Sequence, residues 1–238
     1  MMDYGKNRER FNDLKRKLDT IIPFVGAGLS APFGFPQWKE FLLDCCENDD
    51  VMKEKIKEIL GKKDKERYEL AASYLANKLG MDCFQQKVCK AFDKDIPLLS
   101  ESPIMLFRSL FKQSIITTNF DHVIENLTNY KTVLISQKKE FSEILRGTTP
   151  KVVLKLHGDV KNIENIILTK EQYDQSYLED PEFQEKFANL LMCKTFLFLG
   201  CSLDQDRTME FMSRAKSLEN TRYVKNYAFM ASPAFRFQ

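Results

Sequence analysis

Short runs of apolar residues alternate along the chain with stretches in which apolar and charged residues repeat at helical spacing. In residues 6–19, for example, Phe11, Leu14 and Leu18 recur among charged residues, which predicts a helix with one buried stripe. The apolar runs themselves are nearly continuous, as is typical of strands that are buried on both faces. We expect strands at about 20–25, 114–117, 132–135, 152–156, 195–199 and 227–230.

Helical segments separate most of these strands, and this alternation predicts an α/β fold. The sheet is expected to be doubly wound, mostly parallel and Rossmann-like, with helices on both faces. Because residues 51–112 contain no convincing strand, we expect them to form an all-helical insertion in a core made of residues 1–50 and 113–238. Helices are expected at about 38–47, 51–60, 65–79, 82–92, 104–111, 170–177, 183–192 and 205–217, and a short extended piece at 166–168.

The first expected strand runs into closely spaced small residues, Gly26-Ala27-Gly28-Leu29-Ser30-Ala31. A strand, a tight turn and a helix N-terminus would bring backbone N–H groups together, and the helix dipole would add positive charge. The spacing also fits the dinucleotide fingerprint G-x-G-x-x-G/A. We expect the amides of Ala27 and Gly28 and the hydroxyl of Ser30 to hold phosphate oxygens. The alternative interpretation is a tight turn without a ligand.

The spacing of the strands argues against an ordinary dehydrogenase. Such an enzyme places its second strand soon after the first helix, and an acidic residue follows about 20 positions past the glycines. Here the next expected strand begins only at residue 114.

Four of the expected strands end in small or polar residues, which are Gly26 to Ser30, Asn119 to Asp121, His157-Gly158 and Gly200 to Ser202. Ligands of doubly wound sheets bind outside the carboxyl ends of the strands. The agreement of four such ends therefore favours a single binding site. Each end alone has a simpler interpretation, because Asn and Asp often terminate strands and Gly often turns the chain. A lone histidine is also more often structural.

Composition narrows the classes of function. The 36 basic and 34 acidic residues are interspersed and give a net charge of +2, which argues against a nucleic-acid-binding face. The longest apolar runs are too short to cross a membrane, and no charged-then-apolar leader opens the chain, so we expect a cytoplasmic protein. The six cysteines form no C-x-x-C pair and only two histidines are present, so we expect free thiols and no metal.

Several motifs together carry a resemblance to a known family. On these motifs the chain resembles, from about residue 10 to residue 231, the sirtuin-like NAD-consuming domains of bacterial anti-phage defence proteins. The motifs are Gly26-Ala27-Gly28-Leu29-Ser30, Thr118-Asn119-Phe120-Asp121, Leu156-His157-Gly158, Ile167-Leu168-Thr169 with Tyr173, and Gly200-Cys201-Ser202-Leu203.

Two departures distinguish the chain from the protein deacylases of that family. Deacylases usually carry four zinc-binding cysteines in two C-x-x-C pairs, and this chain has no such pair. Their glycine loop is usually followed by Gly-Ile-Pro-Asp-Phe-Arg, whereas here Gly34-Phe35-Pro36-Gln37-Trp38 lacks the Asp and the Arg. The Pro-x-Trp form and the helical insertion resemble the defence branch.

The resemblance implies an NAD+ glycohydrolase that cleaves the nicotinamide–ribose bond, with NAD+ as its substrate. The products would be nicotinamide and ADP-ribose, or a cyclised form, and the cell would lose its NAD+ during infection. Cleavage leaves positive charge on the sugar, so the site needs a held pyrophosphate, a fixed ribose and a poised water or base. Asn119 offers an amide suited to a ribose hydroxyl or a water, and His157 titrates near neutrality as a general base.

Asp121 would bind near the nicotinamide by the same resemblance, and capping of the following helix is an equally consistent alternative. Ser202 would contact the adenine-side ribose or a phosphate. His122 is interpreted as surface or structural. Asn119 and His157 are thus the candidate catalytic residues, and the candidate NAD+-binding residues are Gly26, Ala27, Gly28, Ser30, Phe35, Trp38, Thr118, Asp121, Gly200 and Ser202.

Two other functions stay open: an NAD-dependent protein deacylase, and a non-catalytic module that binds NAD or ADP-ribose and gates a partner. The resemblance also implies a homo-oligomer and control by a regulatory domain or a partner protein in a defence complex. The apolar end of the sequence, Phe235-Arg236-Phe237-Gln238, suggests a fragment of a longer protein or an end that is buried against another subunit.

Overall fold

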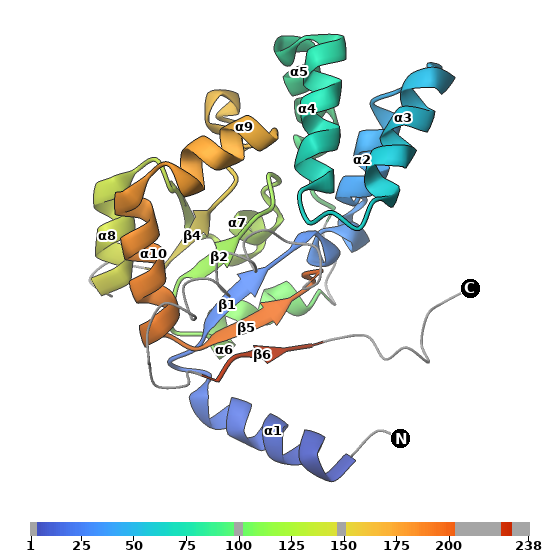
Figure 1. Cartoon of the computed structure of the whole chain (residues 1–238). Helices are drawn as coiled ribbons and strands as arrows, with labels where there is room; N and C mark the ends of the chain where they lie inside the picture. Colours follow the sequence, from blue (N-terminus) through green and yellow to red (C-terminus); the bar gives the residue numbers. More distant parts are fainter. Residues whose placement is uncertain (1–3, 98–101, 147–150, 203–224, 230–238) are drawn as a thin grey trace.

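The computed structural model describes residues 4–97, 102–146, 151–202 and 225–229 (Figure 1). Within them six strands form one sheet in the order β3-β4-β2-β1-β5-β6, and every neighbouring pair is parallel. The predicted α/β class with a parallel, Rossmann-like sheet is confirmed. The strands are β1 (Ile22–Val25), β2 (Ile115–Thr117), β3 (Lys131–Leu134), β4 (Val152–Lys155), β5 (Phe196–Leu199) and β6 (Tyr227–Ala228).

Helices cover both faces of this sheet. Alternate residues of a strand face opposite sides, so Val25 of β1 and Val153 of β4 belong to one apolar core, whereas Phe24 and Leu154 belong to the other. The first core is closed by α1 (Tyr4–Lys17), α2 (Trp38–Asp44), α3 (Asp50–Gly61), α4 (Arg67–Leu79), α5 (Met81–Phe92), α6 (Phe107–Leu110) and α7 (Val123–Thr128), and the second by α8 (Lys138–Arg146), α9 (Lys170–Tyr173), η5 (Asp174–Leu178) and α10 (Pro181–Cys193).

The order of the strands creates a switch point at β1. The chain passes from β1 to β2 on one side, and later crosses from β4 to β5 on the other side of β1. The loops that leave β1 and β5 therefore lie next to each other at the carboxyl edge of the sheet. A crevice at such an edge is where doubly wound folds bind their ligands.

Helices α2 to α5 stand above that edge (Figure 1). Phe41 of α2 packs against Phe84 and Phe92 of α5, and Phe92 in turn packs against Phe120 after β2. The described part of residues 51–112 contains helices and no strand, as expected. The division of the chain into a core and an insertion subdomain stays a prediction.

The segment after β1 differs from the expected helix. Residues Ala27–Leu29 and Ala31–Phe33 form two single-turn 3-10 helices, and the next α-helix begins only at Trp38. Pro32 lies in the first turn of the second of them, and Gly34 ends it with a φ of 82°, which favours glycine. The prediction of a helix N-terminus with its dipole at this turn is therefore wrong.

The short extended piece expected at 166–168 begins with extended backbone at Ile166, and it belongs to no strand. The Ile167 amide donates to the His157 carbonyl (2.9 Å). The helix expected at 170–177 is divided into α9 and a π-helical turn, η5. The helix expected at 205–217 and the apolar end at 235–238 lie outside the described residues.

Cysteines are free thiols, as expected, and no helix among the described residues is long and apolar enough to span a membrane.

Candidate functional site

The carboxyl ends of β1, β2, β4 and β5 border one cavity of about 560 Å³, which we call the strand-end cavity. Every candidate site residue that the sequence suggested lines it, although the residues come from four separate loops. The structure thus brings the whole set together, and the individual roles stay predictions. The set is Gly26, Ala27, Gly28, Ser30, Phe35, Trp38, Thr118, Asn119, Asp121, His157, Gly200 and Ser202.

The glycines after β1 and β5 let two backbones touch. A Cβ on Gly26 would lie 2.7 Å from the Gly200 carbonyl oxygen, and a Cβ on Gly28 would lie 2.9 Å from the same atom. The Gly28 amide donates to that oxygen at 3.0 Å. This amide therefore has a partner within the protein, and its contact with a phosphate oxygen stays a prediction. The glycines here serve the close approach of the two loops.

A chain of hydrogen bonds orients Asn119, whose side chain is buried. The Thr117 hydroxyl donates to the Val25 carbonyl (2.8 Å) and accepts from the Asn119 amide (3.1 Å), which links the end of β2 to β1. The Asn119 side-chain NH2 donates to the Ser30 hydroxyl oxygen at 3.0 Å. Because one end of its carboxamide is held, Asn119 presents the rest of the group in a fixed direction. Ser30, expected to face phosphate, is used to position Asn119.

The side chain of Asp121 caps the helix that follows it, as the alternative interpretation of this residue expected. One of its carboxylate oxygens accepts from the amide of Val123, the first residue of α7, at 3.0 Å. Burial raises the pKa of Asp121, and the hydrogen bonds from Val123 and Ser30 offset part of this effect. Asp121 lines the cavity as well as capping the helix, so its contact with a ligand stays a prediction.

His157 follows β4 and is fixed from several sides. Its ring lies edge-on to the rings of Tyr173 and Tyr177, with centroids 6.1 and 5.9 Å away. The next residue, Gly158, has a φ of +91°, and a Cβ there would lie 2.1 Å from the Asn165 carbonyl oxygen. Only glycine allows this turn, so the position of His157 depends on it.

Side chains from distant parts of the sequence complete the cavity. Tyr68 and Glu69 of α4, Phe92 of α5 and Tyr173 of α9 line it, together with Lys39 of α2. The sequence patterns did not indicate these residues as part of the site, although Tyr173 belongs to one of the family motifs. Nothing in the local pattern of α4 marks Tyr68 or Glu69, because only the packing of the insertion brings them to the strand ends. Lys39 is the one lysine or arginine among the described residues that line the cavity.

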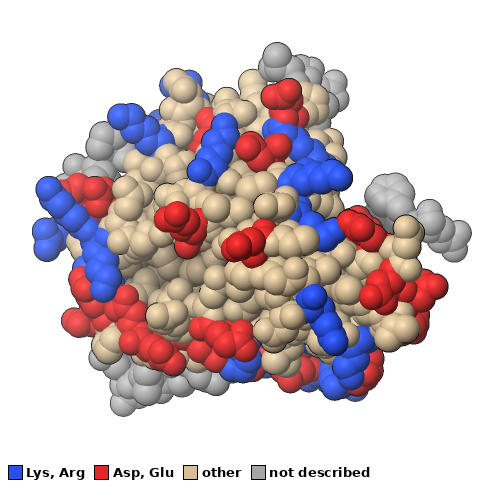
Figure 2. Space-filling model, turned by 90° about the horizontal axis from the view of Figure 1, so that it is seen from above, with Lys and Arg blue, Asp and Glu red and all other residues tan. Residues whose placement is uncertain are grey.

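Polar contacts join α4 to α9 beside the cavity. The Ser73 hydroxyl donates to a Glu171 carboxylate oxygen (2.7 Å) and accepts from the Lys170 amide (3.0 Å). The Lys170 ammonium also lies 3.4 Å from a carboxylate oxygen of Glu66. On the face seen from above, both acidic and basic side chains occur (Figure 2), and several acidic side chains lie next to one another along its lower left edge.

His122, interpreted as surface or structural, is half-buried and takes part in the packing below the cavity. Its Nε2 is 2.7 Å from a carboxylate oxygen of Asp159, the second residue after His157. This contact joins the loop after β2 to the loop after β4, which supports the structural interpretation.

A doubly wound parallel sheet with a cavity at its switch point defines a Rossmann-like α/β domain. A family model described as the SIR2-like domain matches residues 113–237, which is more than half of the chain. The chain belongs to this family.

Similar proteins are longer than this chain. The NAD(+) hydrolase ThsA of Cytobacillus dafuensis is 28% identical over 213 residues, which cover 89% of this chain and 41% of that protein. The NAD(+) hydrolase ThsA of Acinetobacter baumannii is 30% identical over 204 residues, 81% of this chain and 38% of that protein. Defense-associated sirtuin 2 of Bacillus subtilis is 22% identical over 220 residues, 90% of this chain and 21% of that protein. The chain thus spans about two fifths of these ThsA proteins.

Proposed function

We propose that the chain is an NAD+ glycohydrolase that cleaves the nicotinamide–ribose bond of NAD+. The observation that carries this proposal is the strand-end cavity, where Asn119 and His157 lie with the two glycine loops in one wall. The names of the similar proteins, NAD(+) hydrolase ThsA, support the same activity.

The residues would share the reaction as follows. His157 would accept a proton from a ribose hydroxyl or from the attacking water, since an imidazole exchanges protons near neutral pH. Asn119, which Ser30 orients, would hold the ribose or the water while positive charge develops on the sugar. Lys39 and the Ala27 backbone are the proposed partners of the pyrophosphate, because the Gly28 amide is bonded to Gly200.

Binding of the two ends of NAD+ is also part of the proposal. Phe35 and Trp38 would pack against a ring of the substrate, Thr118 and Asp121 would line the nicotinamide end, and Ser202 the adenine end. Cleavage by hydrolysis and cleavage by cyclisation use the same first step, so the pocket around the adenine decides between them.

The decisive experiment incubates the purified chain with NAD+, with and without an acetylated peptide, and separates nicotinamide, ADP-ribose and cyclic products. We expect nicotinamide release without peptide. Turnover only with peptide would support a protein deacylase, and tight NAD+ binding without turnover would support a non-catalytic module. Either result would reject the proposed activity.

Two variants assign the chemistry. Asn119→Ala and His157→Ala should each lower kcat by about 10²–10⁴-fold, the range for a lost positioned acid–base or orienting group. Their melting temperatures should stay close to that of the parent chain. The matched control is Asn126→Ala, an exposed asparagine on α7 outside the strand-end cavity, which should keep full activity. A loss of folding in the first two variants would make these residues structural.

We further propose that the activity serves anti-phage defence by depleting NAD+, in a homo-oligomer controlled by a regulatory domain or partner protein. The names of the relatives support the NAD+ cleavage and the role in defence, whereas the oligomer and its control rest on the family resemblance. Induced expression in bacteria, with intracellular NAD+ measured against Asn119→Ala, tests the depletion. Light scattering of the purified chain tests the oligomer.

A further inference from the structure

Lys155 is the last residue of β4, two positions before His157, and its side chain is completely buried. The other three residues of this strand are apolar. Removing an ammonium group from water is costly unless hydrogen-bond acceptors and opposite charges surround it. The partners of Lys155 therefore indicate what this side chain does.

Two of the partners are backbone groups next to Asn119. The Lys155 ammonium donates to the carbonyl oxygens of Phe120 at 3.0 Å and of Asp121 at 2.6 Å. These are the two residues that follow Asn119 directly. An ammonium group that bonds to two successive carbonyls fixes the orientation of their peptide planes. It therefore also fixes the conformation of the loop that carries Asn119.

The other two partners are carboxylates on either side of the same loop. The ammonium lies 3.2 Å from an oxygen of Glu125, in α7, and 3.2 Å from an oxygen of Asp159, after His157. Burial raises the pKa of Asp159, but the hydrogen bond with His122 and the charge of Lys155 outweigh this effect and hold the pKa at about 2. Asp159 is therefore ionised and anchors the cation from the His157 side.

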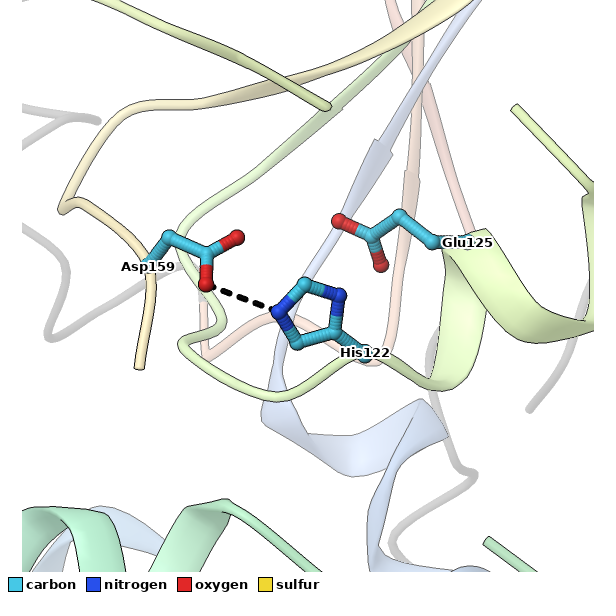
Figure 3. A group of neighbouring side chains, drawn as sticks. All are labelled: His122, Glu125 and Asp159. Carbon is cyan, nitrogen blue, oxygen red and sulfur yellow. Dashed lines mark hydrogen bonds and ion pairs between the residues drawn. The ribbon is translucent and has the colours of Figure 1, made fainter. Parts of the chain in front are cut away.

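These contacts also explain a group of side chains that resembles a metal site. Among the described residues, one potential ligand atom from each of His122, Glu125 and Asp159 lies within 4.8 Å of the others (Figure 3). The Lys155 ammonium already contacts both carboxylates of this group. A divalent cation there would be repelled by the ammonium at close range. The charge that balances these carboxylates comes from the chain itself.

We propose that Lys155 is a positioning residue, an internal cation that holds the loop of Asn119 in register with the loop of His157. It acts through the Phe120 and Asp121 carbonyls and through Asp159, without touching the substrate. This inference rests on the proposed NAD+ hydrolysis for its kinetic readout, and on the geometry alone for its structural readout.

The test replaces Lys155 by methionine, which keeps the length of the side chain and removes its charge. For Lys155→Met we expect kcat to fall on the order of 10²-fold, as for misplacement of a catalytic group by about 1 Å. KM for NAD+ should change by less than about threefold, because the binding surfaces remain. Amide hydrogen exchange should rise selectively in residues 118–124 and 157–161. Lys151→Met is the matched control, since this half-buried lysine precedes β4 and bonds to the Phe111 carbonyl (3.0 Å).

Lys155→Met leaves two buried carboxylates without a counter-charge. If this variant does not fold for that reason, a second pair of variants tests the proposal. The triple variant Lys155→Met/Glu125→Gln/Asp159→Asn is then compared with the double variant Glu125→Gln/Asp159→Asn, which keeps the lysine. The double variant keeps the bonds from Lys155 to the Phe120 and Asp121 carbonyls, so the triple variant should have a lower kcat and faster exchange at 118–124 than the double variant. Unchanged kcat and exchange on loss of the lysine would overturn the proposal. The proposal would also be overturned if exchange rose uniformly along the chain and activity fell only in proportion to the unfolded fraction. If the parent chain releases no nicotinamide, the proposed function fails, and the exchange pattern alone still decides the role of Lys155.

Discussion

The lower and upper walls of the strand-end cavity are held by different kinds of contact. The lower wall consists of the loops after β1, β2, β4 and β5, where buried groups such as Lys155 and Asn119 are bonded on several sides. The upper wall consists of α4 and α9, which meet through contacts such as Lys170–Glu66, whose side chains are 31% and 30% exposed. Buried polar networks are costly to disturb, whereas exposed ion pairs contribute little. The two walls therefore differ in their polar contacts, which are buried in the lower wall and partly exposed in the upper wall.

Apart from variants of Asn119, His157 and Lys155, the largest effect should come from the lower wall at Ser30, whose hydroxyl lies between Asn119 and Asp121. Ser30→Ala leaves the Asn119 NH2 without its acceptor and frees the carboxamide to rotate. We expect kcat for NAD+ cleavage to fall about 10- to 100-fold, since orientation of a reacting group carries effects of this size. Steady-state kinetics on the purified variant measure it.

The control for this change is Ser142→Ala. That serine is on α8, outside the strand-end cavity, and its hydroxyl donates to a carbonyl of its own helix, Lys138 (2.7 Å). Full activity of Ser30→Ala would mean that Asn119 needs no fixed orientation, and the contrast between the two walls would lose its functional meaning.

The lower wall was the better predicted part of the molecule. The strands and the parallel order were predicted from nearly continuous apolar runs and from their alternation with helices, and the polar strand ends were assigned to one site by a general rule for such sheets. These patterns were sufficient to bring Asn119, His157 and the glycine loops to one edge. The turn after β1 was predicted less well, because Pro32 and Gly34 stop each short helix after one turn.

The upper wall and the internal charges were not predicted. Glu69 reaches the cavity through contacts such as Ser73 with Glu171, which are 98 positions apart and have no local signature. Lys155 did leave a signal, because a lysine inside an otherwise apolar buried strand needs acceptors. Its partners depend on the path of the loop after β2, which strand patterns do not specify.

A second prediction concerns acid stability of the lower wall. The folded pKa of Asp159 is about 2, below the ordinary value of 3.8. Its ionised form therefore stabilises the fold fully above pH 3.8, and this contribution is lost as the pH falls through 2. The shift corresponds to about 2 kcal/mol of unfolding free energy. The difference in unfolding free energy between the parent chain and Asp159→Asn, measured by urea unfolding, should shrink by that amount between pH 5 and pH 2. A difference that stays constant with pH would show that the charge of Asp159 is not what stabilises this wall.

The smallest effect is expected at the upper wall, from Ser73→Ala. The lost hydroxyl bonds to Glu171 and to the Lys170 amide, and the cost in unfolding free energy should be about 1–2 kcal/mol, since each such bond usually contributes about 1 kcal/mol. Because no group of the lower wall moves, kcat should stay within about twofold, while the looser contact between α4 and α9 beside the cavity raises KM for NAD+ without a matching loss of kcat. Hydrogen exchange should increase in α4 and α9, and not at 118–124.

Ser109→Ala, in α6, is the control, since its hydroxyl bonds within its own turn to Leu106 (2.8 Å). A fall in kcat as large as that of Ser30→Ala would instead place α4, and Glu69 with it, among the groups that carry the reaction.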